Sequence, residues 1–145
     1  MVRTYGLTHI AIGVRNPARA ARFYQDVLGA TVVYASDDFV QIQTPGSRDV
    51  IVFERATSRV GSSGGIAHFG FRLVDPRDID AAAREVERAG GRVSSRGEFV
   101  AGEPYLFATD PDGYEFEIWY EIPTSADPPS PRKPRPPGTR ARRDA

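Results

Sequence analysis

The chain has 145 residues, no cysteine and a formal net charge of zero. This length is enough for one compact domain with a hydrophobic core. The lack of cysteine excludes disulfides, zinc–thiolate sites and cysteine nucleophiles, and no apolar run approaches the length of a membrane span. Because the N-terminus MVRTYGLTHIAIGV resembles a first strand rather than an export signal, we expect a cytoplasmic protein.

The first half of the chain predicts a strand, a helix and three further strands. Alternating apolar residues favour a strand over GLTHIAIGV, residues 6–14, and Asn16-Pro17 is typical of a helix start. The helix has an apolar stripe that ends before Gly29, made of Ala20, Phe23, Tyr24 and Val27. Three strand-like segments follow, at 31–35, 38–43 and 49–54.

The second half repeats this order after a flexible linker over residues 55–65. The segment GIAHFGFRL, residues 65–73, matches the first strand at an offset of 59, and Asp75-Pro76 matches the first helix start. The second helix has a stripe of Ile79, Ala82, Ala83 and Val86 and ends at Gly90. Strands are predicted at 92–96, 104–109 and 114–121. The sequence therefore predicts an α+β protein of two tandem βαβββ modules, residues 5–54 and 65–121, within one domain over residues 1–122.

The remaining residues, 123–145, have a different composition. They contain seven of the twelve prolines, six basic and two acidic residues, and no aliphatic residue larger than alanine. We expect a disordered Pro/Arg-rich tail, either a solvated appendage or a segment that touches an acidic surface or nucleic acid. The rest of the chain has 13 basic and 17 acidic residues, which argues against a nucleic-acid-binding domain.

The last predicted strand, GYEFEIWYE, carries acids at every second position. Phe116, Ile118 and Tyr120 share one face and are expected to pack against a helix, while Glu115, Glu117 and Trp119 share the other. A carboxylate on a covered face is costly unless it is paired or binds a metal.

The two histidines of the chain, His9 and His68, occupy equivalent positions in the repeated first strands. On each strand the positions out of phase with the histidine hold large apolar residues, and the positions in phase include Ala11, Gly13 and Gly70. Small neighbours leave room beside each imidazole. Two imidazoles and one carboxylate form a facial triad that leaves metal positions open. The alternative is that both histidines are ordinary core residues bonded to the backbone.

The duplicated histidine strand and the motif DPDGYEFEIWYE resemble the vicinal oxygen chelate superfamily over residues 5–121. This group includes glyoxalases, fosfomycin-resistance proteins, bleomycin-binding proteins, extradiol dioxygenases and methylmalonyl-CoA epimerase. The resemblance implies that the modules form a concave mixed sheet that houses a divalent metal (Fe, Mn, Ni, Co or Zn), with His9, His68 and Glu117 as its ligands.

The resemblance also allows individual branches to be tested against the sequence. Glyoxalase I has a further carboxylate in the last strand of module one, where this chain has apolar residues around Val52; Glu54 is expected to be a surface acid. Extradiol dioxygenases have a tyrosine where this chain has Phe107, and they use additional histidines. Fosfomycin-modifying enzymes use a hydroxyl-rich, cationic pocket near their last two strands. No well-known activity of the family fits cleanly, so catalytic residues beyond the metal ligands are not assigned.

The walls of the pocket follow from strand phase. The residues expected to face inward by phase are Gln41, Gln43, Arg72, Tyr105, Phe107, Glu115 and Trp119. Of these, the residues expected to bind a small-molecule substrate are Gln43, Arg72, Tyr105, Phe107 and Trp119. Arg72 could instead pair with Glu115 or a neighbouring acid, the aromatic residues could be core filling, and Glu115 is expected to be exposed.

Two functions remain open. The first is a metal-dependent enzyme, a lyase, isomerase or dioxygenase, that chelates vicinal oxygens of a small substrate and stabilises an enolate or oxyanion. The second is a metal-free binding protein of the bleomycin-resistance kind that sequesters an aromatic toxin. We expect no membrane partner, and we expect a C2 homodimer in which His9 meets His68 and Glu117 of the other subunit.

Overall fold

The computed structural model describes residue 7 and residues 9–124. The first module consists of β1 (His9–Val14), α1 (Pro17–Leu28), β2 (Thr31–Ala35), β3 (Phe39–Gln43) and β4 (Val50–Arg55). The second consists of β5 (Phe69–Arg72), η1 (Pro76–Asp78), α2 (Ile79–Arg88), β6 (Arg92–Glu98), β7 (Pro104–Thr109) and β8 (Glu115–Trp119). The predicted order of strands and helices is confirmed.

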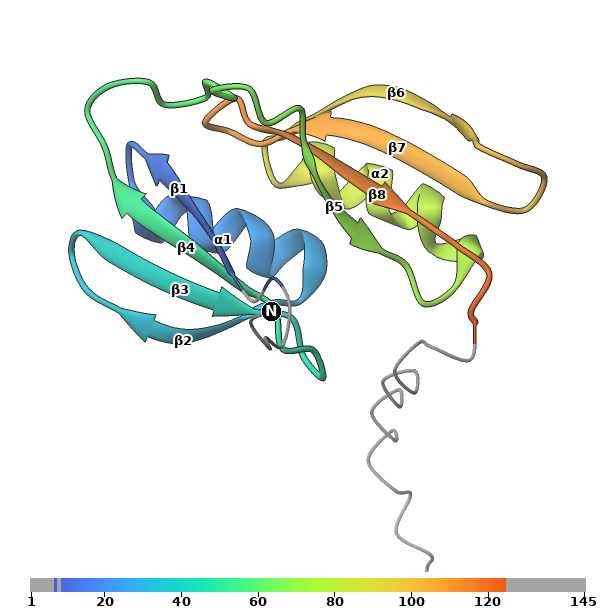
Figure 1. Cartoon of the computed structure of the whole chain (residues 1–145), viewed down its shortest axis with the longest axis horizontal. Coiled ribbons are helices and arrows are strands. Elements are labelled where there is room, and N and C mark those ends of the chain that lie inside the picture. The colour runs from blue at the N-terminus through green and yellow to red at the C-terminus, as the bar shows by residue number, and fades with distance from the viewer. Residues whose placement is uncertain (1–6, 8, 125–145) are drawn as a thin grey trace, which may run out of the picture.

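Each module folds its four strands into a mixed sheet (Figure 1). The strand orders are β1-β4-β3-β2 and β5-β8-β7-β6, so the topology of the first sheet is repeated in the second. In both sheets the first strand runs parallel to the last, and the other neighbours are antiparallel. The predicted fold class is confirmed. In each sheet the first strand lies at an edge, paired on one side only. His9 is the first residue of β1, whereas His68 immediately precedes β5, so the second strand begins later than the predicted residue 65.

The two helices begin differently although their start signals match. The Asn16 side chain accepts a hydrogen bond from the backbone N–H of Arg19, and α1 follows at once. Asp75 instead accepts from the N–H of Arg77 and leads into the 3₁₀ turn η1, so the α-helix itself begins only at Ile79.

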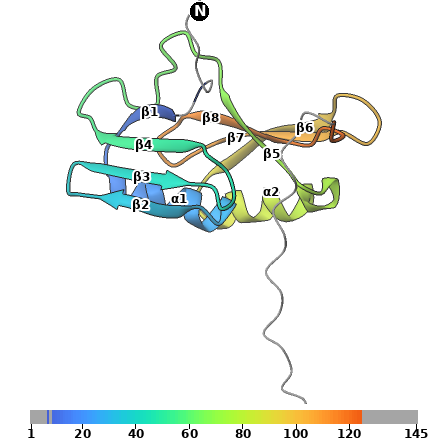
Figure 2. The same ribbon diagram turned by 60° about the horizontal axis from the view of Figure 1, so that its bottom comes forward.

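Both helices lie in one layer beneath the two sheets (Figure 2). The core between the layers is shared by the modules, and the ring of Tyr24 from α1 lies at its centre. Its centroid is 5.4–6.4 Å from rings of both modules, namely those of Phe53, Phe69, Phe71 and Phe116. The predicted apolar faces of the strands therefore pack against the helix layer, with the exception of Tyr120, which follows the end of β8 and is not part of this core.

The hydroxyl of Tyr24 connects α1 to the turn before β8. It donates to the buried carboxylate of Asp110 at 3.0 Å, and the backbone N–H groups of Asp112 and Tyr114 donate to the other carboxylate oxygen at 3.0 and 2.9 Å. Burial raises the pKa of Asp110, although these hydrogen bonds act in the opposite direction. Burial, together with the Asp110 charge, raises the pKa of Tyr24, so its hydroxyl stays protonated and available as a donor.

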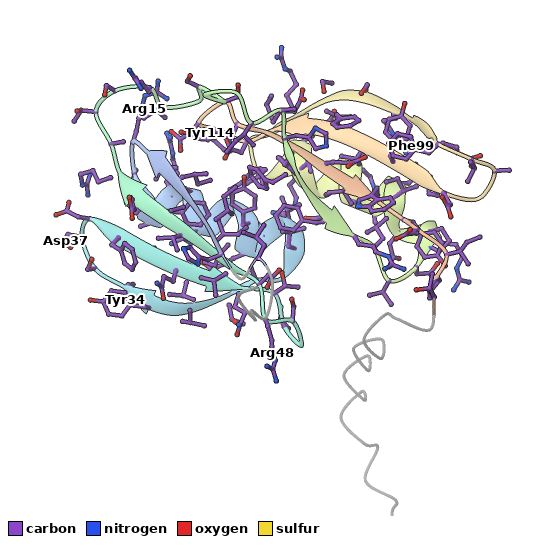
Figure 3. All side chains as sticks on the ribbon, viewed as in Figure 1. Arg15, Tyr34, Asp37, Arg48, Phe99 and Tyr114 are labelled. Atoms are coloured by element: carbon purple, nitrogen blue, oxygen red, sulfur yellow. The ribbon has the colours of Figure 1, made fainter. Side chains whose placement is uncertain are left out.

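The same turn is fastened to module one by side chains around β1. Arg19 and Arg15 pair with the buried carboxylate of Asp112 at 2.8 and 3.5 Å. The Tyr114 hydroxyl donates to the carbonyl oxygen of Gly13 at 2.6 Å. Figure 3 labels Arg15 and Tyr114 at this junction. The DPDG motif thus has a structural role within the chain, because its contacts hold the two modules together.

The linker also contacts this turn. Gly61 has a φ of 77°, and a Cβ built on it would lie 2.5 Å from the carbonyl oxygen of Asp112. A side chain at this position would be strained and would also clash with backbone.

No helix among the described residues is long and apolar enough to cross a membrane. The tail predicted over residues 123–145 lies outside the described residues except for Pro123 and Thr124.

Candidate metal centre

The face of the second sheet opposite α2 carries two of the three predicted ligands, His68 and Glu117, and the predicted aromatic walls of the pocket. Strand register places Gly70 beside Glu117, and Glu117 beside Phe107. One step further along, Trp119 lies between Arg72 and Tyr105. The alternation predicted for the last strand therefore places Glu117 and Trp119 on this face, while Phe116 and Ile118 are fully buried on the helix side.

His68 and Glu117 form the central pair of this face. The Nε2 atom of His68 lies 3.6 Å from Oε2 of Glu117, and the two side chains are 35% and 11% exposed. The other carboxylate oxygen, Oε1, is buried and has no hydrogen-bond partner. Burial raises the pKa of Glu117, and the nearby His68 partly opposes this.

These features fit a divalent metal. A buried carboxylate oxygen without a partner leaves a desolvation cost uncompensated, which a cation bound beside it would offset. An imidazole nitrogen 3.6 Å from a carboxylate oxygen is a separation that two ligands of one metal ion can adopt. The donor set of nitrogen and oxygen suits the first-row metals named above.

His9 lies on the equivalent face of the first sheet. It lines a hollow of about 340 Å³ with Ala11, Phe39, Gln41, Val50, Val52 and Glu54. Register pairs Ala11 with Val52, as Gly70 pairs with Glu117, so Val52 is the structural counterpart of the metal carboxylate. Glu54 is exposed, as predicted, although it does line the hollow.

Within one chain His9 does not join His68 and Glu117. Among the described residues there is no group of three histidine or carboxylate side chains that could hold one metal ion. A cleft of about 350 Å³ lies where β1 and the start of β5 approach each other, lined partly by residues 10–13 and 66–69. A single chain therefore brings together two of the three predicted ligands.

An aromatic row continues from His68 across the second sheet. The His68 ring contacts Phe107 at a centroid distance of 4.9 Å, and Phe107 contacts Tyr105 at 5.6 Å. Tyr105 in turn stacks on Phe99 at 4.2 Å with an interplanar angle of 18°. Phe99 also contacts the edge of Trp119 at 6.5 Å. These rings remain partly exposed, so they wall the face rather than fill the core.

Phe99 was not among the predicted pocket residues. It follows the end of β6 and is 53% exposed (labelled in Figure 3). The sequence could have indicated it through strand alternation. Phe99 lies two residues after Gly97, which pairs with Tyr105, so both positions are on the same face of the strand.

Among the polar residues predicted to bind substrate, Arg72 pairs with a neighbouring acid, which is the alternative that the sequence analysis left open for it. Its guanidinium lies 3.6 Å from the Glu121 carboxylate and donates to the Glu121 carbonyl oxygen at 3.1 Å. Glu115 is exposed, as predicted. Gln43 is half-buried on the same face of β3 as Gln41, at the far end of that strand.

Comparison with known proteins agrees with this architecture. The model of the Glyoxalase/Bleomycin resistance protein/Dioxygenase superfamily matches residues 6–118. A catechol-2,3-dioxygenase of Bacillus subtilis (strain 168) is 29% identical over 126 residues, which are 81% of this chain and 43% of the dioxygenase. The chain thus spans less than half the length of that relative.

Two solved fosfomycin resistance proteins have the same fold. FosX from Mesorhizobium loti is 21% identical with a TM-score of 0.68, covering 83% of this chain and 95% of its own. A FosX mutant from Listeria monocytogenes, solved in complex with Mn(II) and 1S,2S-dihydroxypropylphosphonic acid, is 19% identical with a TM-score of 0.67, covering 80% of this chain and 90% of its own.

Proposed function

Because the chain belongs to the Glyoxalase/Bleomycin resistance protein/Dioxygenase superfamily, we propose that it is a metal-dependent enzyme that acts on a small substrate with vicinal oxygens. His68 and Glu117 of one subunit and His9 of the partner subunit would hold the metal. The observation that carries this proposal is the buried, unpartnered Oε1 of Glu117 beside the His68 imidazole. Buried carboxylates with a structural role accept hydrogen bonds from side-chain donors, as Asp110 does from Tyr24 and Asp112 does from Arg19.

The homodimer is part of the proposal because the site is incomplete without a second chain. The strand that begins at His9 and the strand that follows His68 both lie at sheet edges, and an edge strand offers unpaired backbone groups to another chain. Two equivalent apolar side chains before these strands, Leu7 and Ile66, are 94% and 58% exposed. Pairing of one subunit's first sheet with its partner's second sheet would cover these edges and bring His9 to the other two ligands.

A metal bound by these three side chains would chelate two adjacent substrate oxygens and stabilise an enolate or oxyanion as it develops. The protein's own part is to bind and orient. Glu117 and His68 would hold the metal against the second sheet, and Phe107 and Tyr105 would exclude water along one side of the bound substrate. With Val52 in place of a further carboxylate, a base on the module-one side is absent from that position.

Within the family, our proposal for the reaction type depends on the similar proteins. The catechol-2,3-dioxygenase match favours a dioxygenase, and the Mn(II) complex of FosX supports a divalent metal in this fold. On the basis of the Mn(II) complex we propose manganese before iron, nickel, cobalt or zinc, and we propose a cytoplasmic location from the sequence.

Metal analysis of the purified protein, with a chelator-treated control, tests the proposal directly. Stoichiometric divalent metal that is lost on chelation and restored on addition supports the enzyme. A protein that binds no metal under any of these conditions overturns it.

The shared site is tested by mixing two inactive variants. Subunit exchange between His9→Ala and Glu117→Ala proteins should restore one intact site in each mixed dimer, since one site then combines unaltered ligands from both chains. If every site lay within a single chain, each would keep a lesion and no metal binding would return.

The second candidate is a metal-free protein that sequesters a flat aromatic molecule. The exposed stack of Phe99 on Tyr105 favours it, because an aromatic ligand could extend this stack. Binding of aromatic ligands that is unaffected by chelation, in a protein without metal, would favour this function over the enzyme.

A further inference from the structure

The face beside Glu117 has an open space where a side chain is missing. Gly70 lies in β5 without a positive φ, so its backbone does not require glycine. A Cβ built on Gly70 would lie 3.4 Å from Oε2 of Glu117 and 3.7 Å from Nε1 of Trp119. The equivalent position of module one holds Ala11, so this strand geometry tolerates a methyl group. The glycine therefore matters for the space that it leaves.

The indole N–H of Trp119 borders this space. An indole nitrogen can only donate a hydrogen bond. Within the part of the chain that the structure describes, Trp119 Nε1 donates to no protein acceptor. Its ring is half-buried beside Phe99, which restricts its motion. A donor without an acceptor thus lies on one side of the Gly70 space, and the metal-binding carboxylate lies on the other.

We propose that the space over Gly70 receives an oxygen of the substrate, which accepts a hydrogen bond from Trp119 Nε1. The inference rests on the proposed metal site and specifies its substrate further. The substrate has a phenolate- or enolate-type oxygen within reach of both the metal and the indole. An N–H fixed in a partly desolvated site stabilises negative charge on that oxygen better than water does. Trp119 is therefore a substrate-binding donor and not only an aromatic wall.

The test uses the full-length protein loaded with Zn²⁺ and titrated with 4-nitrocatechol, which has two vicinal oxygens and a visible absorbance. Trp119→Phe keeps an aromatic ring but removes the N–H. We expect its affinity for 4-nitrocatechol to fall about 10- to 100-fold, the value of one hydrogen bond to a charged oxygen, with Zn²⁺ affinity unchanged. Gly70→Ala should also weaken 4-nitrocatechol binding, because its methyl group occupies the space.

Tyr34→Phe is the matched control. Tyr34 is an exposed aromatic residue on β2 of the other sheet (Figure 3), so this variant should bind both Zn²⁺ and 4-nitrocatechol like the unaltered protein. Trp119 is the only tryptophan in the chain, so quenching of its fluorescence provides a second readout in every protein except Trp119→Phe.

The outcomes separate this inference from the proposed function. If Trp119→Phe or Gly70→Ala keeps Zn²⁺ and binds 4-nitrocatechol as tightly as the unaltered protein, the substrate oxygen does not lie over Gly70 and the inference is wrong. If the unaltered protein binds no Zn²⁺, the metal site itself is wrong and the inference falls with it.

Discussion

The two sheets have the same backbone register but opposite chemistry on their open faces. The strand position of Ala11 corresponds to that of Gly70, and the position of Val52 to that of Glu117. Where module two has Trp119, module one has Glu54. In the proposed site, module two would supply a carboxylate ligand and an aromatic wall, while module one would supply one imidazole. Repetition of a fold preserves where side chains point, and it leaves each half free to change what they do.

The helices differ in the same way. Phe23 and Tyr24 of α1 correspond, at the offset of 59, to Ala82 and Ala83 of α2. Only the first helix carries large rings here, and the ring of Tyr24 contacts the sheets of both modules. The packing that joins the modules within one chain is therefore one-sided, and it comes from module one.

The largest expected effect comes from removing a proposed metal ligand, whether it belongs to module one or to module two. We expect His9→Ala, His68→Ala and Glu117→Ala each to weaken divalent metal binding by at least about 100-fold, since each removes one of three protein ligands. Titration calorimetry of the purified variants measures this. Glu54→Ala and Glu115→Ala are the controls and should bind like the unaltered protein. Loss of metal in a folded Glu54→Ala protein would contradict the three-ligand assignment.

Making module one resemble module two should change stability strongly. Val52→Glu places a carboxylate at a position that is 6% exposed, and without metal we expect it to cost about 3 kcal/mol of unfolding free energy. Added metal should recover much of this loss, because the new carboxylate faces the shared site. Thermal unfolding with and without Mn²⁺ measures both effects.

Val52→Gln is the control for this change, since it adds polarity without charge and should gain less from metal. A metal-induced rise in the midpoint of Val52→Glu no larger than that of the unaltered protein would place residue 52 outside the metal site.

The one-sided packing is tested by Tyr24→Phe. The change keeps the ring and leaves Oδ2 of the buried Asp110 carboxylate without its donor, so we expect a loss of about 2 kcal/mol in denaturant unfolding. Tyr34→Phe removes a hydroxyl from an exposed ring and should change stability by less than about 0.5 kcal/mol. Equal effects of the two changes would show that the Tyr24 hydroxyl does not join the modules.

The smallest effect is expected from Glu117→Gln without metal. Because the folded state raises the pKa of Glu117, the ionised carboxylate destabilises the fold, and this penalty is present above the raised pKa and absent below the ordinary one. Glu117→Gln should therefore stabilise the metal-free protein by about 1 kcal/mol at neutral pH, and the gain should shrink towards about pH 4. A variant less stable than the unaltered protein at neutral pH would argue that Glu117 has a structural partner.

Local pattern was sufficient for the elements and for one face of the site. Strand side chains alternate with a period of two, so the spacing of Phe116, Glu117 and Ile118 was enough to predict which of them pack against the helices and which lies on the opposite face. The repeat in the chain likewise predicted both histidine strands. These features depend on neighbours in sequence, and the sequence records them directly.

Only the tertiary structure decided which side chains meet. The register of β1 against β4 identified Val52 as the counterpart of Glu117, and the Tyr24–Asp110 hydrogen bond joins residues 86 positions apart. The space over Gly70 next to Trp119 depends on two strands that are far apart in sequence. Such contacts are set by strand pairing and core packing across the whole fold, and a periodic pattern carries no information about which distant residue lies opposite.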